Sequence, residues 1–237
     1  MYSLISEQNQ PFSLLHTFNF SRLRKRMVEN QLCPQHITEV RILDAFRAVP
    51  REKFIPPALH PVAYSDGLLE ILPGQYMMPP FMLGRLIQAL RPQESDSILV
   101  IGDVTGYTSA LLSGLSGGVV SLIPETLPES HVNAIKEVLD THSPNPVILK
   151  QGPLEKGAPL YAPYSHLFFE GALTHFPKNL LDALMTEGSA IAMLWQNHHL
   201  AKGTLYEKTA QTSSERVLFE SSLPLLSAFK QKDSFSF

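Results

Sequence analysis

The sequence predicts a doubly wound α/β fold with a mostly parallel sheet and a helical extension at its N-terminus. From about residue 97 onward, short apolar runs alternate with segments that carry apolar residues at helical spacing. The first third of the chain is instead helical in pattern. Alternation of short buried strands with helices is typical of parallel βαβ units, which bind ligands at the carboxyl ends of their strands.

The first third of the chain is expected to form three helices. Apolar residues at three- and four-residue spacing predict helices over Arg22–Leu32 and Glu39–Val49, the second ending at Pro50. Residues 56–80 are rich in proline, have no clean period and are expected to form an ordered loop. Helical spacing resumes over Pro79–Leu90, where a proline in the first turn costs little because the N–H groups there lack helical partners.

The remainder predicts the α/β core. Apolar runs predict strands at Ser97–Ile101, Val119–Ile123, Pro146–Leu149, Leu167–Phe169 and Ala190–Trp195, with helices at Tyr107–Leu115, Pro128–Thr141 and Pro177–Met185. Alternating patches at Thr204–Lys208 and Arg216–Ser221 predict antiparallel strands at one edge of the sheet. We therefore expect one compact domain with three regions: an arm (residues 1–21), a helical and loop region (22–92), and the core with its edge-strand tail (93–237).

Composition and charge argue against several classes of function. A net charge of -3 and a pI of about 6.3 leave no basic footprint for a nucleic acid. The single cysteine, Cys33, excludes an internal disulfide and a cysteine-cluster metal site, and no His-Glu-x-x-His pattern is present. No apolar run approaches the roughly 18–20 residues that cross a bilayer, and residues 1–21 do not resemble a secretory signal. We expect a soluble cytoplasmic protein without a metal, nucleic-acid or membrane partner, and the sequence does not indicate its oligomeric state.

The loop after the first core strand is the candidate ligand site. It runs from Gly102 to Tyr107 and contains Asp103 and Gly106. Glycines there let the backbone turn tightly and approach a ligand, while the helix N-terminus offers free N–H donors. From spacing alone, an ordinary strand-to-helix turn and a nucleotide-type site fit equally well, and a P-loop is disfavoured because no Lys-Ser/Thr pair follows.

Short blocks upstream of this loop point to a known family. They are Met27-Val-Glu-Asn-Gln-Leu32, Ile42-Leu-Asp-Ala-Phe46, Val49-Pro-Arg-Glu52, Phe54-Ile-Pro56, Ala63-Tyr-Ser-Asp66 and Gly74-Gln75. Their order and distances resemble those of the protein-L-isoaspartate O-methyltransferases, and the match continues through Leu99–Tyr107 and Leu180–Gly188. The resemblance implies a class I, Rossmann-like methyltransferase fold. It also implies an enzyme that uses S-adenosylmethionine to methylate isoaspartyl residues of damaged proteins.

Site residues follow from the resemblance. It implies cofactor contacts by Gly102, Asp103, Gly106, Tyr107, Glu125, Gln151 and Gly152. On the substrate side, Asp66 is the surviving polar residue and our candidate catalytic residue, with capping of a loop turn as the alternative role. Met78 stands where the family has a serine that helps to place the substrate carboxylate, and a thioether cannot donate a hydrogen bond.

Three further sites depart from the family pattern. At the loop, Val104 replaces the central glycine and Val100 replaces an acid, and we expect a β-branched residue at position 104 to be costly if the turn needs positive φ or close approach of the cofactor. Pro124 stands where an acid normally binds the ribose, one residue before Glu125, and Pro153 replaces an acid near the adenine. Two functions therefore stay open. One is a carboxyl methyltransferase of weak activity or changed acceptor. The other is an inactive family member that serves as an interaction or structural module, through apolar residues of the arm and of Phe235–Phe237.

Overall fold

A computed structural model describes residues 18–197 and 200–229, so most of the predicted arm and the Phe235–Phe237 end lie outside the described residues. The α-helices are α1 (Phe20–Met27), α2 (Val40–Ala48), α3 (Pro80–Leu90), α4 (Tyr107–Ser113), α5 (Glu129–His142) and α6 (Lys178–Leu181). The strands are β1 (Leu69–Leu72), β2 (Gln75–Met77), β3 (Ser97–Ile101), β4 (Gly118–Pro124), β5 (Val147–Gly152), β6 (Tyr164–Leu173), β7 (Leu184–Asn197), β8 (Leu200–Lys208) and β9 (Ser213–Ser221).

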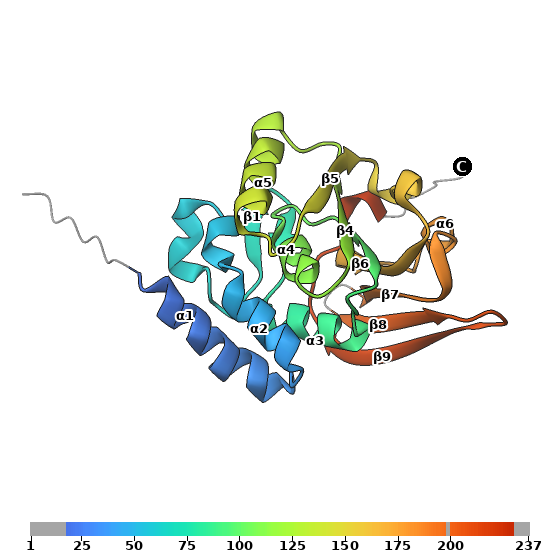
Figure 1. Ribbon diagram of the computed structural model, residues 1–237, viewed down its shortest axis with the longest axis horizontal. Coiled ribbons are helices and arrows are strands. Elements are labelled where there is room, and N and C mark those ends of the chain that lie inside the picture. The colour runs from blue at the N-terminus through green and yellow to red at the C-terminus, as the bar shows by residue number, and fades with distance from the viewer. Residues whose placement is uncertain (1–17, 198–199, 230–237) are drawn as a thin grey trace, which may run out of the picture.

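The main sheet has the order β5-β4-β3-β6-β7-β8-β9. Strands β5 to β7 are parallel, and β8 and β9 continue the sheet as an antiparallel hairpin that extends to the right in Figure 1. The predicted doubly wound, mostly parallel fold is thus confirmed, and the two alternating patches of the tail form the predicted edge strands. The chain builds outward from β3 to β5 and then returns to β6, so the strand order reverses between β3 and β6.

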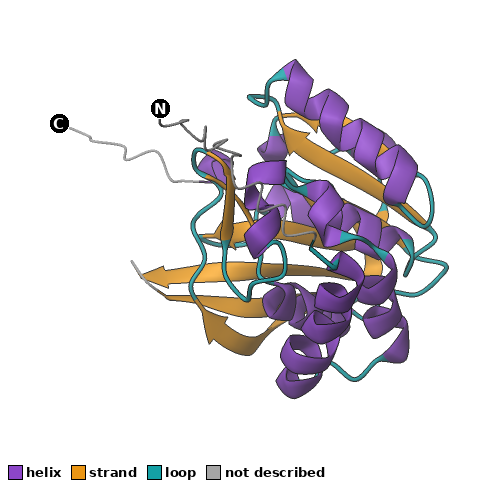
Figure 2. Cartoon of the chain, turned by 90° about the vertical axis from the view of Figure 1, so that its left-hand side faces the viewer, coloured by secondary structure: helices purple, strands orange, loops and turns teal. Residues whose placement is uncertain are grey.

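The two faces of the sheet are covered unequally. Successive residues of β3 alternate between two apolar clusters: Ile98 and Val100 pack with helices α2 to α5, whereas Leu99 and Ile101 pack with α6 and the turns before β6. Figure 2 shows the helices gathered mainly on one side of the strands. This alternation follows from the period of two in a strand that is buried on both sides.

The helical extension differs from the sequence expectation in detail. The helix expected over Arg22–Leu32 starts at Phe20 as α1 and continues from Val28 to Leu32 as a π-helical turn. The proline-rich stretch holds a small hairpin, β1-β2, and a 3₁₀ turn at Pro57–Val62.

The helix expected over Pro177–Met185 shortens to Lys178–Leu181, because Leu184 already pairs with Tyr164 in the sheet. Within the described residues, no helix is both long and apolar enough to cross a membrane.

A largely buried polar triad joins α1 to Glu52 and Tyr64 in the helical and loop region of residues 22–92, which is the substrate-side region of the family resemblance. The Arg24 guanidinium donates to the Tyr64 hydroxyl at 3.0 Å and to the Glu52 carboxylate at 2.9 Å, and the Tyr64 hydroxyl donates to the other oxygen of Glu52. Burial and the Glu52 carboxylate raise the pKa of Tyr64. The triad therefore stays protonated at the tyrosine and holds the segment before Asp66 against the first helix.

Candidate active site

The crevice between β3 and β6 is the expected ligand position in this sheet. Ligands of open α/β sheets bind outside the carboxyl ends of the strands, where the strand order reverses. Gly102 follows β3 directly, and Gly171 lies near the end of β6. In the parallel register Pro124 pairs with Gly152. The structure thus brings Gly102, Glu125 and Gly152 to the same edge of the sheet.

Asp103 is fully buried, and its carboxylate accepts hydrogen bonds from the donors of the loop. Its Oδ1 accepts from the Thr105 amide at 3.2 Å, the Thr105 hydroxyl at 3.0 Å and the Gly106 amide at 2.8 Å. Its Oδ2 accepts from the Ser109 amide at 2.9 Å and hydroxyl at 2.8 Å. The carboxylate therefore satisfies the N-terminus of α4 from within the chain, as capping side chains do, and its predicted contact with a cofactor stays a prediction.

The structure explains why the loop has a glycine at position 106 and tolerates a valine at position 104. Gly106 has φ +83°, and a Cβ there would lie 3.1 Å from the Leu139 side chain of α5. Val104 is 1% exposed, and the positive-φ residues of the described chain do not include it. The expected backbone cost of a β-branched residue at this position is therefore wrong, because the turn places Val104 in ordinary backbone conformation with its side chain in the core.

Tyr107 faces the helical extension. It is completely buried, its ring packs against Phe54 with centroids 5.5 Å apart, and the Arg51 guanidinium carbon lies 5.0 Å from its centroid. Burial raises the pKa of Tyr107 to about 12, partly offset by the positive charge of Arg51. Arg51 is also fully buried, and its Nε and Nη2 donate to the carbonyls of Ala63 and Met78 at 2.9 and 2.8 Å. Tyr107 thus packs in the core that joins the loop to the substrate-side region.

Glu170 is the unexpected ionisable group of the crevice. It is 3% exposed at the carboxyl end of β6, where it accepts the hydroxyl of Thr108 and, at 3.3 Å, the amide of Met78. Burial raises its pKa to about 8, and the nearby charge of Asp103 adds to the shift. Glu170 is therefore mostly protonated at neutral pH, which removes one of two negative charges from a low-dielectric site.

Met78 is held on both sides of its backbone. Its carbonyl accepts from Arg51 and its amide donates to Glu170, while its side chain is 1% exposed. The neighbouring residues Met77, Pro79 and Pro80 are also buried. Residues 77–80 thus form a closed wall of the crevice, and Met78 has no hydroxyl to donate to a substrate carboxylate.

A C-terminal strap, residues Leu223–Phe229, covers the crevice. The Leu226 amide donates to the Ala172 carbonyl at 2.9 Å, and the Ala172 amide donates to the Pro224 carbonyl at 3.1 Å. A Cβ on Gly171 would lie 2.3 Å from Leu226 Cγ, and a Cβ on Gly102 would lie 3.1 Å from its Cδ2. The absence of side chains at both glycines therefore lets Leu226 enter the switch point.

This conformation does not fit an adenosylmethionine-sized ligand. The cavity that contains Gly102, Glu170, Gly171 and Leu226 has a volume of only about 20 Å³. Pockets for ligands of this size measure roughly 300–1,000 Å³. With the strap in place, the crevice is filled by the apolar side chain of Leu226.

The residues expected at ribose and adenine lie at the exposed edge. The Gln151 amide nitrogen donates to the carbonyls of Leu127 at 2.9 Å and Glu125 at 3.2 Å, so it fastens the β4–α5 loop to β5. The side chains of Glu125 and Gln151 are exposed, and Gly152 is half-buried. Within residues 18–197 and 200–229, no three His, Cys, Asp or Glu side chains gather in a way that would hold a metal ion.

Asp66 lies apart from these groups. Its side chain is exposed, partial burial raises its pKa, and among the described residues it has no hydrogen bond or ion pair.

Sequence reasoning missed Arg51, Glu170 and Leu226. A charged residue directly after the apolar run Leu167–Phe169 was an available signal for Glu170. Leu226 had no such signal, because its contact with Gly102 joins distant parts of the chain.

Known proteins match most of the chain. The model of the family "Protein-L-isoaspartate(D-aspartate) O-methyltransferase (PCMT)" matches residues 22–221. A protein-L-isoaspartate O-methyltransferase 2 of Anaeromyxobacter sp. (strain Fw109-5) is 32% identical over 168 residues, which cover 71% of this chain and 68% of the relative. A protein-L-isoaspartate O-methyltransferase of Aeropyrum pernix is 34% identical over 174 residues, covering 73% of this chain and 66% of the relative.

Solved structures share the fold. A protein-L-isoaspartate O-methyltransferase superimposes with a TM-score of 0.71 at 19% identity, covering 86% of this chain and 65% of that one. A putative enzyme of this type from Plasmodium falciparum, in complex with S-adenosyl-L-homocysteine, superimposes with a TM-score of 0.69 at 17% identity, covering 89% and 99%. The chain belongs to the protein-L-isoaspartate O-methyltransferase family, whose members use S-adenosylmethionine.

Proposed function

We propose that the protein is an S-adenosylmethionine-dependent methyltransferase for isoaspartyl residues of damaged proteins, and that cofactor entry displaces the C-terminal strap. The observation that carries the proposal is the crevice between Gly102 and Gly171. It lies at the switch point of a family member's sheet, it is bounded by two residues without side chains, and the Leu226 side chain occupies it. Glycines at such positions permit close approach of a ligand. The proposal includes a cytoplasmic location.

A ligand that enters the crevice has to displace Leu226, while Leu223 and Phe229 at the two ends of the strap can stay packed against the core. The two backbone hydrogen bonds between the strap and Ala172 contribute about 1 kcal/mol each, and burial of Leu226 contributes about 2 kcal/mol. A total of roughly 4 kcal/mol corresponds to about a thousandfold loss of cofactor affinity, since 1.4 kcal/mol is tenfold. The closed form therefore weakens cofactor binding without abolishing it.

Calorimetric titration with S-adenosylhomocysteine tests the proposal on the full chain. We compare the wild type with Leu226→Asp, which places a charge beside Glu170 and expels the strap. Leu160→Asp is the matched control, because Leu160 is 92% exposed and lies outside the crevice. We expect Leu226→Asp to bind at least tenfold more tightly than the wild type and Leu160→Asp to bind like the wild type. Each protein is then assayed for methylation of an isoaspartyl peptide.

An inactive interaction or structural module is the second candidate. Two observations favour it: the Asp103 carboxylate already accepts its hydrogen bonds from within the chain, and the buried Met78 side chain has no hydroxyl to donate to a substrate. The same titration separates the two candidates. If the wild type and a folded Leu226→Asp both fail to bind S-adenosylhomocysteine at millimolar concentration, the methyltransferase proposal is overturned. Asp66 is our proposed catalytic residue only under the first candidate.

A further inference from the structure

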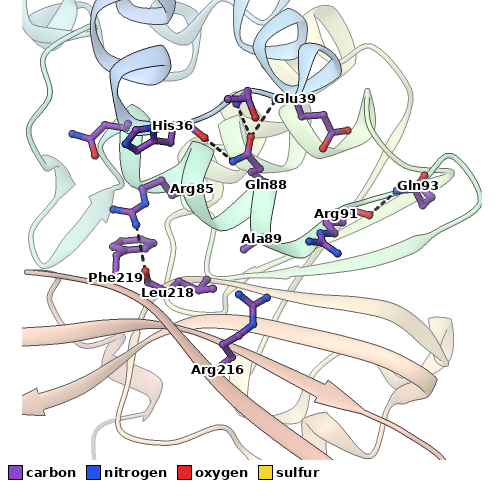
Figure 3. A pocket seen from close by; sticks show the side chains of 12 residues that line it. His36, Glu39, Arg85, Gln88, Ala89, Arg91, Gln93, Arg216, Leu218 and Phe219 are labelled. Carbon is purple, nitrogen blue, oxygen red and sulfur yellow. Dashed lines mark hydrogen bonds between the residues drawn. The ribbon is translucent and has the colours of Figure 1, made fainter.

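An open pocket of about 580 Å³ lies between the turn that precedes α2, helix α3 and strand β9 (Figure 3). Its walls share no residue with the cavity that contains Gly102 and Leu226. Its volume falls within the range of pockets that bind small molecules of nucleotide size. It is therefore a candidate binding site separate from the crevice of the proposed methyltransferase.

Three arginines meet at this pocket. Arg85 is fixed in place, since its guanidinium carbon lies 4.2 Å from the ring centroid of Phe219 and its Nη2 donates to the Leu218 carbonyl at 3.3 Å. Figure 3 shows Arg91 and Arg216 extending into the space between α3 and β9 from opposite walls. A guanidinium carries five N–H donors, so most donors of the three groups remain for a ligand.

The pocket keeps a positive charge. Glu39 is the single acidic residue among those that line it, and Arg41 pairs with Glu39 at 2.6 Å. Among the described residues, Arg85, Arg91 and Arg216 form no ion pair with an acidic side chain. The positive charges of these three arginines repel each other across the cavity, and an anion bound between them relieves that repulsion.

Two lining residues hold a backbone conformation that disfavours side chains. Arg91 ends α3 with φ 55° and ψ 51°, and His36 ends the turn at Cys33–Gln35 with φ 61° and ψ 29°. Glycine or asparagine usually occupies a left-handed position at a helix end, and other residues cost roughly 1 kcal/mol there. Such outliers gather at functional sites. Both residues line the same pocket, and at Arg91 the backbone cost is accepted where a guanidinium group is gained.

We propose that this pocket binds a phosphorylated small molecule with at least two negative charges. Guanidinium groups bind phosphate oxygens through paired N–H donors, and charge-assisted hydrogen bonds of this kind are about twice as strong as neutral ones. Arg85 forms a rigid end of the site, while Arg91 and Arg216 close on the phosphate from the helix and the strand. The ligand is held by charge, so its affinity falls as the salt concentration rises.

Titration of the full chain with inorganic pyrophosphate at low salt tests the site. The variants are Arg91→Gly and Arg216→Gln, and the control is Arg47→Gln. Arg47 is also an arginine of the helical region, but it pairs with Asp44 at 2.7 Å and does not line the pocket. We expect saturable binding by the wild type and the control, and at least tenfold weaker binding by each pocket variant.

Thermal unfolding separates loss of the ligand group from loss of the fold. Arg91→Gly removes a side chain from a left-handed position, so this variant should unfold at a higher temperature while it binds pyrophosphate less tightly. The proposal is overturned if pyrophosphate gives no heat with the wild type at millimolar concentration. It is also overturned if Arg47→Gln weakens binding as much as the pocket variants, which would mean general attraction to charge. Neither outcome depends on the titration with S-adenosylhomocysteine.

Discussion

Buried charged residues next to the crevice connect the substrate-side region to the sheet. Arg51 and Glu170 both bind the backbone of Met78, one through its carbonyl and the other through its amide. Both are almost fully buried, and burial lowers the pKa of Arg51 while it raises the pKa of Glu170. Each group costs free energy to bury and recovers part of it through fixed hydrogen bonds.

The raised pKa of Glu170 predicts a specific pH dependence of stability. The carboxyl has an ordinary pKa of 4.5 in the unfolded chain and about 8 in the folded protein, so the folded protein binds the proton more tightly. Its stabilising effect is fully present below about pH 4.5 and is lost as the pH rises through 8. Between pH 5 and pH 9 the free energy of unfolding of Glu170→Gln relative to the wild type should rise by on the order of 4 kcal/mol, since about three pKa units count roughly 1.4 kcal/mol each.

Urea unfolding at several pH values in this range checks the prediction. Glu137→Gln on α5 is the control, because Glu137 is exposed and its replacement should not change the slope against pH. Parallel curves for Glu170→Gln and the wild type would contradict the raised pKa.

At the scale of elements, the junction of the loop with α4 and α5 determines how the crevice is built. The N-terminus of α4 is satisfied by Asp103, and Gly106 lies against Ile135 and Leu139 of α5. The loop therefore has structural reasons for its aspartate and for its second glycine that do not require a cofactor.

Gly106→Ala should destabilise the protein by about 2 kcal/mol. The substitution places a Cβ 3.1 Å from Leu139 at a residue with φ +83°, so it adds both overlap and backbone strain. Gly118→Ala is the matched control, since a Cβ there meets no atom within 4 Å, and its effect should stay below about 0.5 kcal/mol. Equal stability of the two variants in urea unfolding would contradict the close contact between the loop and α5.

At the scale of the whole molecule, the two ends of the described chain pack against different parts of the sheet. The helical extension builds one face of the core, while the strap closes the switch point on the carboxyl edge. The strap and a cofactor would occupy the same volume. Under the proposed function, the cofactor therefore binds only when the strap has left the crevice.

Hydrogen exchange should report this exclusion directly. In the closed form the amides of Leu226 and Ala172 are both hydrogen-bonded between the strap and β6. Saturating S-adenosylhomocysteine should speed exchange at these two amides, because it releases the strap, and should leave the central strand β3 unchanged. Slower exchange at Leu226 in the presence of the ligand would mean that the strap closes over the cofactor instead of being displaced.

Local patterns in the sequence determined the order of the elements and the family. Strand β3 was predicted at its observed bounds, and α2 and α3 within one residue at each end, because buried strands and amphipathic helices report their environment through spacing alone. The short α6 was predicted too long, since pairing of Leu184 with Tyr164 in the sheet overrides helical spacing. The division into an arm, a helical and loop region and a core stays a prediction.

The occupant of the site follows from tertiary packing. The contacts of Arg51 with Met78, of Met78 with Glu170, and of Leu226 with Gly102 join residues that are far apart in the chain. Spacing carries no information about such contacts, because they depend on how whole elements pack and on where the chain returns after β9. The family and the edge of the sheet at which the site lies could therefore be predicted from local patterns. The structure decided that this site is closed by an apolar strap, because two glycines leave room there for a leucine from the C-terminal segment.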